Sequence, residues 1–146
     1  MTPNGMTHRE VSAEHPRVAV FLHSGDYDRM HEGLSVAAAA VASGRHVDLF
    51  FFWWALERLA QDKLDAPDLV PQREDIENRF ESRNVPTLRS LLSFLRESGD
   101  CTLYACTGSL AIVGLAPSAL ERKVDQLVGW TTILQLTAGV TDRFLL

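Results

Sequence analysis

The alternation of short apolar segments with segments of helical spacing constrains the fold of this chain most. Residues 17–22 (RVAVFL), 46–52 (HVDLFFF) and 101–105 (CTLYA) are rich in apolar and β-branched residues and predict buried strands, and residues 143–146 predict a terminal strand. Helices are predicted at residues 30–43, 53–60, 87–98 and 129–138, with a short helix after Cys106 and a turn or short helix within residues 117–124. This order predicts an α/β fold: one small doubly wound domain, with a mainly parallel sheet of about five strands and helices on both faces.

The length of 146 residues suits a single domain, which we assign to residues 17–146. Residues 1–16 are polar and predict a flexible N-terminal tail. Residues 61–86 carry many charged side chains and three prolines, which predicts a charged surface excursion, partly helical around Ile76 and Phe80. A solvated face is the simpler interpretation of this segment, and a mobile lid or partner-binding loop is the alternative.

Charge and hydropathy exclude several classes of protein. The net charge is -5, and the single adjacent basic pair, Arg122-Lys123, is bracketed by Glu121 and Asp125, so no basic footprint for nucleic acid is present. The longest apolar run, residues 49–56, is far shorter than the roughly 20 residues of a membrane-spanning helix. The N-terminus lacks the apolar core of a signal peptide, and two cysteines do not suit a disulfide-stapled scaffold. We therefore expect a cytoplasmic protein that binds neither nucleic acid nor membrane.

The carboxyl ends of the predicted strands indicate where chemistry would occur, because ligands gather there in open parallel sheets. These ends carry His23, Ser24, Gly25 and Asp26 after the first strand, Trp53 and Trp54 after the second, and Cys106, Thr107 and Gly108 after the third. Cys106 directly precedes a predicted helix, whose positive end and free amide groups favour an anionic sulfur. Cys106 is thus the candidate catalytic residue, and the substrate-binding candidates are His23, Ser24, Gly25, Thr107 and Gly108. The simpler alternatives are an inert core thiol for Cys106 and a merely solvated side chain for His23.

The second cysteine, Cys101, is predicted to be structural. It stands at the start of the same strand, and an extended segment would separate its α-carbon from that of Cys106 by roughly 16 Å. A disulfide requires a separation below about 7 Å. The pair is therefore expected to form neither a disulfide nor a thioredoxin-type motif.

No metal or cofactor is predicted. His31 and His46 have no second ligand at metal-binding spacing. The loop after the first strand lacks the GxGxxG spacing of dinucleotide sites. Ser24 or Ser109 would suit a hydrolase, but the GxSxG motif is absent.

Four segments, in this order and spacing, carry a family resemblance: RVAVFLHSGDYD, GLSVAAAAVASGRHVDLFFF, LYACTGSLAIVGL and GWTTILQLTAGVTDRFLL. Together they resemble the DsrE/DsrF-like family, which includes subunits of a bacterial sulfur relay of the TusD type. The similarity extends from about residue 17 to residue 146, and Cys106 matches the position of the family's cysteine.

The resemblance implies a sulfurtransferase or sulfur-carrier subunit, in which Cys106 accepts sulfane sulfur as a persulfide and passes it to a partner thiol. It also implies a homo-oligomer, a trimer or hexamer, or assembly with related subunits, together with sulfur donor and acceptor proteins as partners. Two alternatives remain open. One is a non-catalytic oligomeric assembly or binding protein of the same fold, and the other is a thiol redox sensor in which peroxide oxidises Cys106.

Overall fold

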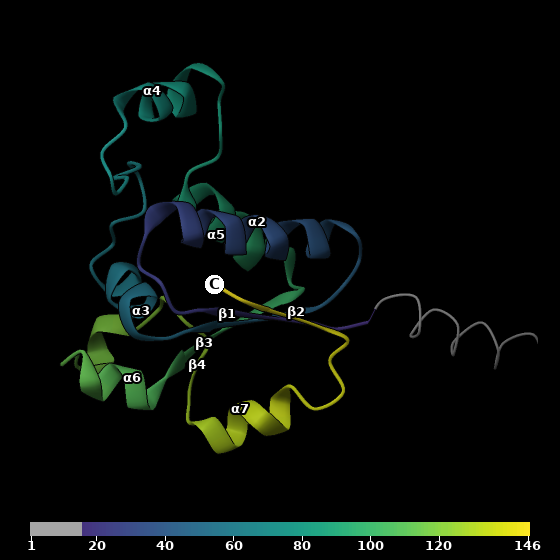
Figure 1. The fold of residues 1–146 in the computed structure, drawn as a ribbon. Coiled ribbons are helices and arrows are strands. Elements are labelled where there is room, and N and C mark those ends of the chain that lie inside the picture. The colour runs from purple at the N-terminus through teal and green to yellow at the C-terminus, as the bar shows by residue number, and fades with distance from the viewer. Residues whose placement is uncertain (1–15) are drawn as a thin grey trace, which may run out of the picture.

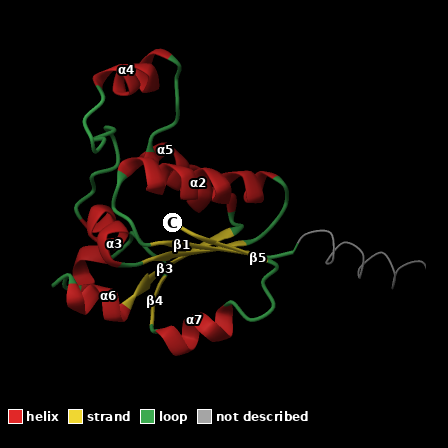
Figure 2. Ribbon diagram, in the orientation of Figure 1, coloured by secondary structure: helices red, strands yellow, loops and turns green. Residues whose placement is uncertain are grey.

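The computed structural model describes residues 16–146, which place helices on both sides of one parallel sheet (Figure 1, Figure 2). The strands are β1 (Val18–Leu22), β2 (Val47–Phe51), β3 (Cys101–Cys106), β4 (Gln126–Val128) and β5 (Asp142–Leu145). The helices are α2 (Tyr27–Ala42), α3 (Trp53–Ala60), α4 (Glu74–Ser82), α5 (Leu88–Ser98), α6 (Thr107–Ile112) and α7 (Trp130–Leu136), with a short 3-10 helix η1 (Pro117–Leu120). All strand pairs are parallel in the order β4-β3-β2-β1-β5, which confirms the predicted doubly wound α/β fold.

Residues 1–15, the greater part of the predicted tail, lie outside the described residues. None of the helices within residues 16–146 has the length and apolar character needed to cross a membrane.

The strand register brings the carboxyl ends of all five strands to one edge. Leu22 pairs with Phe51, and Phe51 pairs in turn with Ala105. On the flanks, Cys106 pairs with Val128, and Phe21 pairs with Leu145. Segments that are far apart in the sequence therefore leave the sheet side by side, which is the arrangement expected for a ligand site.

Two hydrophobic cores lie on opposite faces of the sheet. The larger core lies on the face covered by α2 and α5, and the smaller one lies on the face covered by α7 (Figure 1). Side chains alternate between the two faces along a strand, so residues five positions apart point in opposite directions. Cys101 accordingly belongs to the larger core, and Cys106 belongs to the smaller one.

Local sequence explains where two of the helices begin or end. Thr87 caps α5, because its side chain accepts a hydrogen bond from the Ser90 amide at 3.1 Å. Gly99 ends the same helix with φ of 75°, in the left-handed region that glycine adopts without a steric penalty. Gly44, after α2, has φ of 81°. Helix α2 itself begins at Tyr27, three residues before the predicted start at residue 30.

Strand β4 was not among the predicted segments. It has only three residues, and two of them, Gln126 and Leu127, are exposed. Its local sequence carries little strand signal, because β4 is defined by pairing with the end of β3.

The charged segment 61–86 leaves the body of the domain and carries α4 at its far end (Figure 1). Helix α4 includes Ile76 and Phe80, where the sequence suggested helix, and none of its residues is buried. Two aromatic contacts join it to the body: the Phe80 ring packs edge-on against Tyr27 and against His31, with ring centroids 5.8 and 5.3 Å away.

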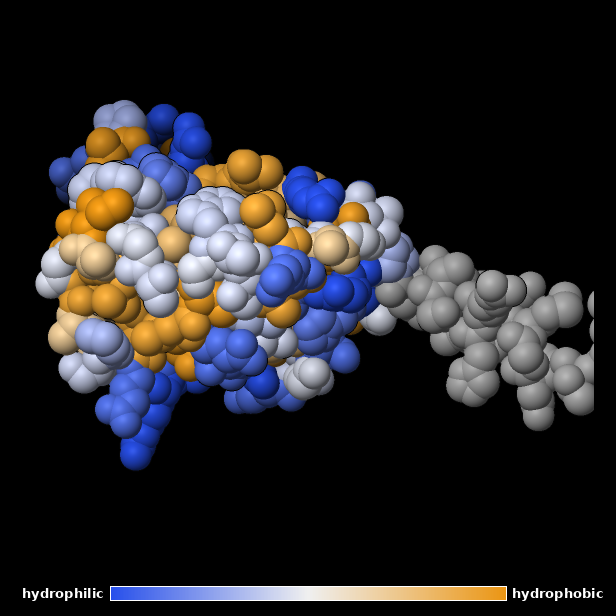
Figure 3. All heavy atoms as spheres, turned by 90° about the horizontal axis from the view of Figure 1, so that it is seen from below, coloured by the Kyte–Doolittle hydropathy of each residue, from blue (hydrophilic) through white to orange (hydrophobic). Residues whose placement is uncertain are grey.

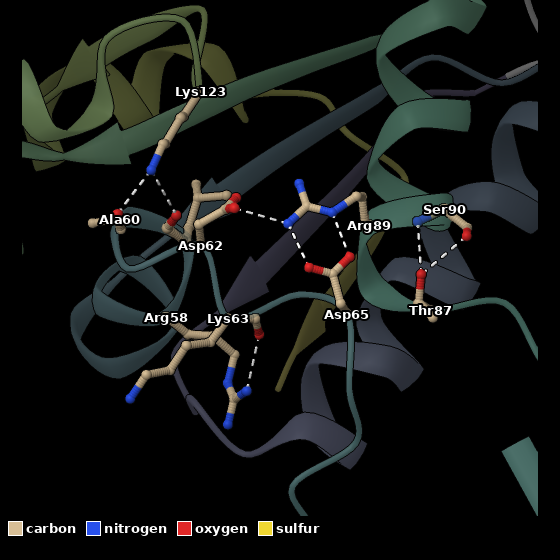
Figure 4. Close-up of polar contacts among 10 residues, drawn as sticks. Arg58, Ala60, Asp62, Lys63, Asp65, Thr87, Arg89, Ser90 and Lys123 are labelled. Atoms are coloured by element: carbon tan, nitrogen blue, oxygen red, sulfur yellow. Dashed lines mark hydrogen bonds and ion pairs between the residues drawn. The ribbon is translucent and has the colours of Figure 1, made fainter. Parts of the chain in front are cut away.

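Ion pairs fix the start of this segment (Figure 4). Arg89 of α5 binds Asp62 at 2.8 Å and also contacts both carboxylate oxygens of Asp65. Hydrogen bonds from this guanidinium lower the pKa of both carboxyl groups and raise the pKa of Arg89 above its ordinary value. Nearby, Lys123 donates to the carbonyl oxygen of Ala60 at 2.8 Å. The path of the chain out of α3 is thus set by side chains from α5 and from the loop after η1.

Candidate functional site

A cavity of about 470 Å³ opens at the carboxyl edge of the sheet, on the face covered by α7. It receives residues at or just beyond the ends of β1, β2, β3 and β5, and residues of α3, α6 and α7. Its lining residues are Phe21, His23, Phe52, Trp53, Cys106, Gly108, Ser109, Ile112, Trp130, Leu145 and Leu146. Cys106 therefore lies in a cavity that segments distant in sequence build together.

Cys106 is the last residue of β3 and the N-cap of α6. Only 3% of the residue is exposed, yet it lines the open cavity. No amide of α6 donates a hydrogen bond to its side chain, so the sulfur carries no capping contact in the described part of the chain. The sequence led us to expect amide contacts at this sulfur, and the structure does not contain them.

Gly108 leaves space beside the sulfur. A β-carbon placed on Gly108 would lie 3.8 Å from the Cys106 sulfur, which is ordinary van der Waals contact. The missing side chain therefore keeps one approach to the sulfur open from the cavity.

Aromatic rings form much of the cavity wall. Phe52 stacks on Trp130 at 5.1 Å between ring centroids, and Phe21 stacks on Phe52 at 6.0 Å. Trp53 lies 6.0 Å from the His23 ring. Its backbone φ is 43°, a left-handed conformation that costs a bulky residue of the order of 1–3 kcal/mol and often accompanies functional sites.

The cavity wall is mostly apolar. Among residues 16–146, no Asp, Glu, Lys or Arg side chain lines it, and its lining includes the polar side chains of His23 and Ser109. Around the cavity mouth, Ile112, Trp130 and Leu145 are 61, 56 and 77% exposed. Figure 3, which views the molecule from the side of α6 and α7, shows apolar side chains in a connected area on this face.

The predicted substrate-binding residues separate into two groups. His23 and Gly108 line the cavity together with Cys106, whereas Thr107 is exposed and does not line it. Ser24 and Gly25 line a neighbouring cavity of about 350 Å³ on the other side of the turn. The Ser24 hydroxyl accepts a hydrogen bond from the Asp26 amide at 3.1 Å, so it stabilises the loop that leads into α2.

Gly25 has a steric role in that turn. A β-carbon on Gly25 would come within 2.7 Å of the Trp54 carbonyl oxygen. The backbone of this turn therefore packs directly against the start of α3, which leaves no room for a side chain.

Cys101 lies at the opposite end of β3 and is a free thiol, as is Cys106. Burial, aided by the negative charges of Asp125 and Asp48, raises the pKa of Cys101 to about 12. A thiol that stays protonated at neutral pH is a poor nucleophile. The structural role predicted for Cys101 agrees with this environment.

Several lining residues were not candidates in the sequence, notably Trp130, Ile112 and Leu145. Trp130 begins α7 directly after β4, so recognition of that short strand would have placed it at the same sheet edge. Ile112 lies on a helix of six residues, and Leu145 lies at the end of an edge strand. Neither position has a sequence signal that distinguishes it from an ordinary apolar residue.

No cluster of three or more His, Cys, Asp or Glu side chains suited to a metal ion occurs within residues 16–146. Comparison with models of known protein families finds no match to this chain. The chain is similar to a Bacillus subtilis (strain 168) protein named "Uncharacterized protein YrkE", with 25% identity over 135 residues, which covers 75% of this chain and 84% of that protein. The name of this relative states no activity.

Proposed function

We propose that this protein transfers sulfur within the cell: Cys106 accepts sulfane sulfur as a persulfide and passes it to the thiol of a partner, as the resemblance to the DsrE/DsrF-like family implies. One observation carries the proposal. Cys106 lies at the carboxyl end of β3. The residue is only 3% exposed to solvent, and it nevertheless lines an open cavity.

The chemistry is a thiol exchange without net oxidation. The Cys106 thiolate attacks the outer sulfur of a donor persulfide, R–S–SH. A new S–S bond forms on Cys106, the donor's S–S bond breaks, and R–S⁻ leaves with the electron pair and is protonated to R–SH. An acceptor thiolate then attacks the outer sulfur of the Cys106 persulfide, and the Cys106 thiol is regenerated.

The surroundings of Cys106 suit such a carrier. Gly108 leaves the sulfur open on the cavity side, so a donor or acceptor sulfur has a line of approach. Elsewhere, the smaller hydrophobic core encloses the residue. A persulfide held in this way is shielded from most of the bulk solvent, and therefore from unselective reaction with other thiols.

The test is intact-mass analysis after incubation with a persulfide donor. We expect the protein to gain the mass of one sulfur atom, and we expect the gain to persist in Cys101→Ser and to be absent from Cys106→Ser. Addition of a small acceptor thiol should remove it. Failure to label Cys106 with any protein or small-molecule persulfide donor would contradict the proposal.

A second candidate function is a non-catalytic assembly or binding protein of the same fold. It is favoured by the exposed apolar side chains Ile112, Trp130, Leu134 and Leu145, since contiguous apolar surface often marks a protein interface. Measurement of the mass in solution, together with the alkylation rate of Cys106, separates the two candidates. A large assembly with an inert Cys106 favours this second function, whereas a reactive Cys106 favours sulfur transfer.

A further inference from the structure

The cavity beside Cys106 has the size and composition of a small-molecule site. Its volume of about 470 Å³ falls within the range of roughly 300–1,000 Å³ that is usual for ligand pockets. Such pockets are lined mainly by apolar and aromatic side chains, with a few polar groups that orient the ligand. Here Phe52, Trp53 and Trp130 supply aromatic surface, and the lining also includes the polar side chains of His23 and Ser109.

Ser109 provides a hydroxyl group at the cavity wall. The residue is only 3% exposed and lines the cavity, and its hydroxyl takes part in no hydrogen bond with any residue of 16–146. Every side-chain nitrogen or oxygen that is sealed from solvent in this part of the chain has a partner. The Ser109 oxygen therefore keeps some exposure to solvent, and because the residue lines the cavity, a polar atom of a ligand can bind it there.

The wall composition selects against anions. No lysine or arginine side chain lines the cavity in the described structure, so a sulfonate, thiosulfate or carboxylate would lose hydration without gaining an ion pair. An uncharged aromatic or aliphatic group has the opposite balance, because it loses little hydration and gains contact with the rings of Phe52 and Trp130.

We infer that the Cys106 cavity takes an uncharged, apolar organic persulfide or disulfide, whose ring or chain packs on the aromatic wall and whose polar atom bonds to Ser109. The inference rests on the proposed function, which identifies the Cys106 sulfur as the reacting atom. It adds the class of small molecule that reaches this sulfur. Inorganic and carboxylated sulfur compounds are excluded as good substrates.

Two aromatic disulfides of similar reactivity provide the test: neutral dithiodipyridine and dianionic dithiobis(nitrobenzoate). In each case the Cys106 thiolate attacks one sulfur, a mixed disulfide forms on Cys106, and an aryl thiolate leaves and is measured by its absorbance. The full-length Cys101→Ser protein makes Cys106 the sole reporter. The measurement is made at about pH 8, above the range in which histidine side chains ordinarily titrate.

For Cys106, the rate of reaction with dithiodipyridine is divided by the rate of reaction with dithiobis(nitrobenzoate). This ratio is then divided by the same ratio measured for a small free thiol. We expect this normalised ratio to exceed about 10, because an unpaired charge is costly to desolvate. A value near unity would overturn the inference. A parallel fall in the rates of both reagents as the protein concentration rises would also overturn the inference. A second copy of the chain would then be covering the cavity.

A charge inserted at the cavity mouth gives a matched pair of variants. Ile112→Lys places a cation on the lining, whereas Leu134→Lys places one at a similarly exposed position that does not line the cavity; the two side chains are 61 and 66% exposed. We expect Ile112→Lys to lower the normalised ratio by at least a few-fold, through a faster reaction with the dianion, and Leu134→Lys to leave it unchanged. Equal effects of the two variants would contradict the inference.

The outcomes distinguish this inference from the proposed function. If Cys106 takes up sulfur from persulfide donors but reacts with both disulfides in the ratio of a free thiol, sulfur transfer stands and the apolar ligand does not. If the neutral reagent is strongly preferred but no donor yields a persulfide, the cavity binds apolar ligands and the sulfur transfer proposal fails.

Discussion

Gly108→Ala tests whether the missing side chain at this position keeps the Cys106 sulfur accessible. The added methyl carbon would lie 3.8 Å from the sulfur, a distance at which carbon and sulfur touch without repulsion. Gly108 lies within α6 and its backbone is not left-handed, so alanine fits the local conformation. We therefore expect the variant to fold normally while its methyl group covers one approach to a residue that is only 3% exposed.

Gly108→Ala should raise the free energy of unfolding and lower the reaction rate of Cys106. Alanine has the higher helix propensity, so the free energy of unfolding should rise by up to about 1 kcal/mol. The rate at which Cys106 reacts with dithiodipyridine should fall by roughly threefold to tenfold, which corresponds to about 0.7–1.4 kcal/mol in activation free energy. Denaturant unfolding measures the first quantity, and stopped-flow absorbance on the Cys101→Ser background measures the second.

Ala111→Gly is the matched control. Ala111 belongs to the same helix, is exposed and does not line the cavity. This change should lower the free energy of unfolding by up to about 1 kcal/mol and leave the rate unchanged. The reasoning is refuted if Gly108→Ala unfolds more easily than the parent protein, or if it reacts as fast as the parent while remaining folded.

Three further predictions depend on Cys101 and Arg89, which lie away from the cavity. The pKa of Cys101 is raised to about 12, so only about one molecule in a thousand holds this thiolate at about pH 9. Iodoacetamide should therefore modify Cys106 long before Cys101 in the folded protein. The position of the label in peptide mass spectra checks this. The same raised pKa predicts that stability declines as the pH rises from about 8.5, where an unfolded thiol ionises, toward the folded value, and that Cys101→Ala removes this part of the decline. Arg89→Ala should release the start of the charged segment, with faster amide hydrogen exchange across residues 62–73 and little change in the strands. Since Arg89 lowers the pKa of Asp62 and Asp65, the parent protein should show the same faster exchange at high salt, or when acid protonates both carboxylates. Identical hydrogen exchange in the variant and the parent would contradict this role of Arg89.

The alternation of strands and helices was readable from the sequence because each buried parallel strand is a local apolar run. Residues 47–51 are all buried, and four of the five are apolar, so this strand is marked by an apolar segment that only Asp48 interrupts. The position of Cys106 followed from the same reasoning, since a residue between a strand and the next helix must lie at the carboxyl edge of a parallel sheet. These features depend on neighbours in the chain.

The composition of the cavity was decided by tertiary structure. His23 and Ser24 are adjacent in sequence, yet the turn after β1 directs them into different cavities. Trp130 and Leu145 reach the Cys106 cavity because β4 and β5 are the two outermost strands of the sheet. Strand β4 is recognisable only through its pairing with β3. Local sequence sets the conformation of each segment, but the surroundings of the sulfur depend on contacts between residues far apart in the chain, and those contacts arise only when the sheet assembles.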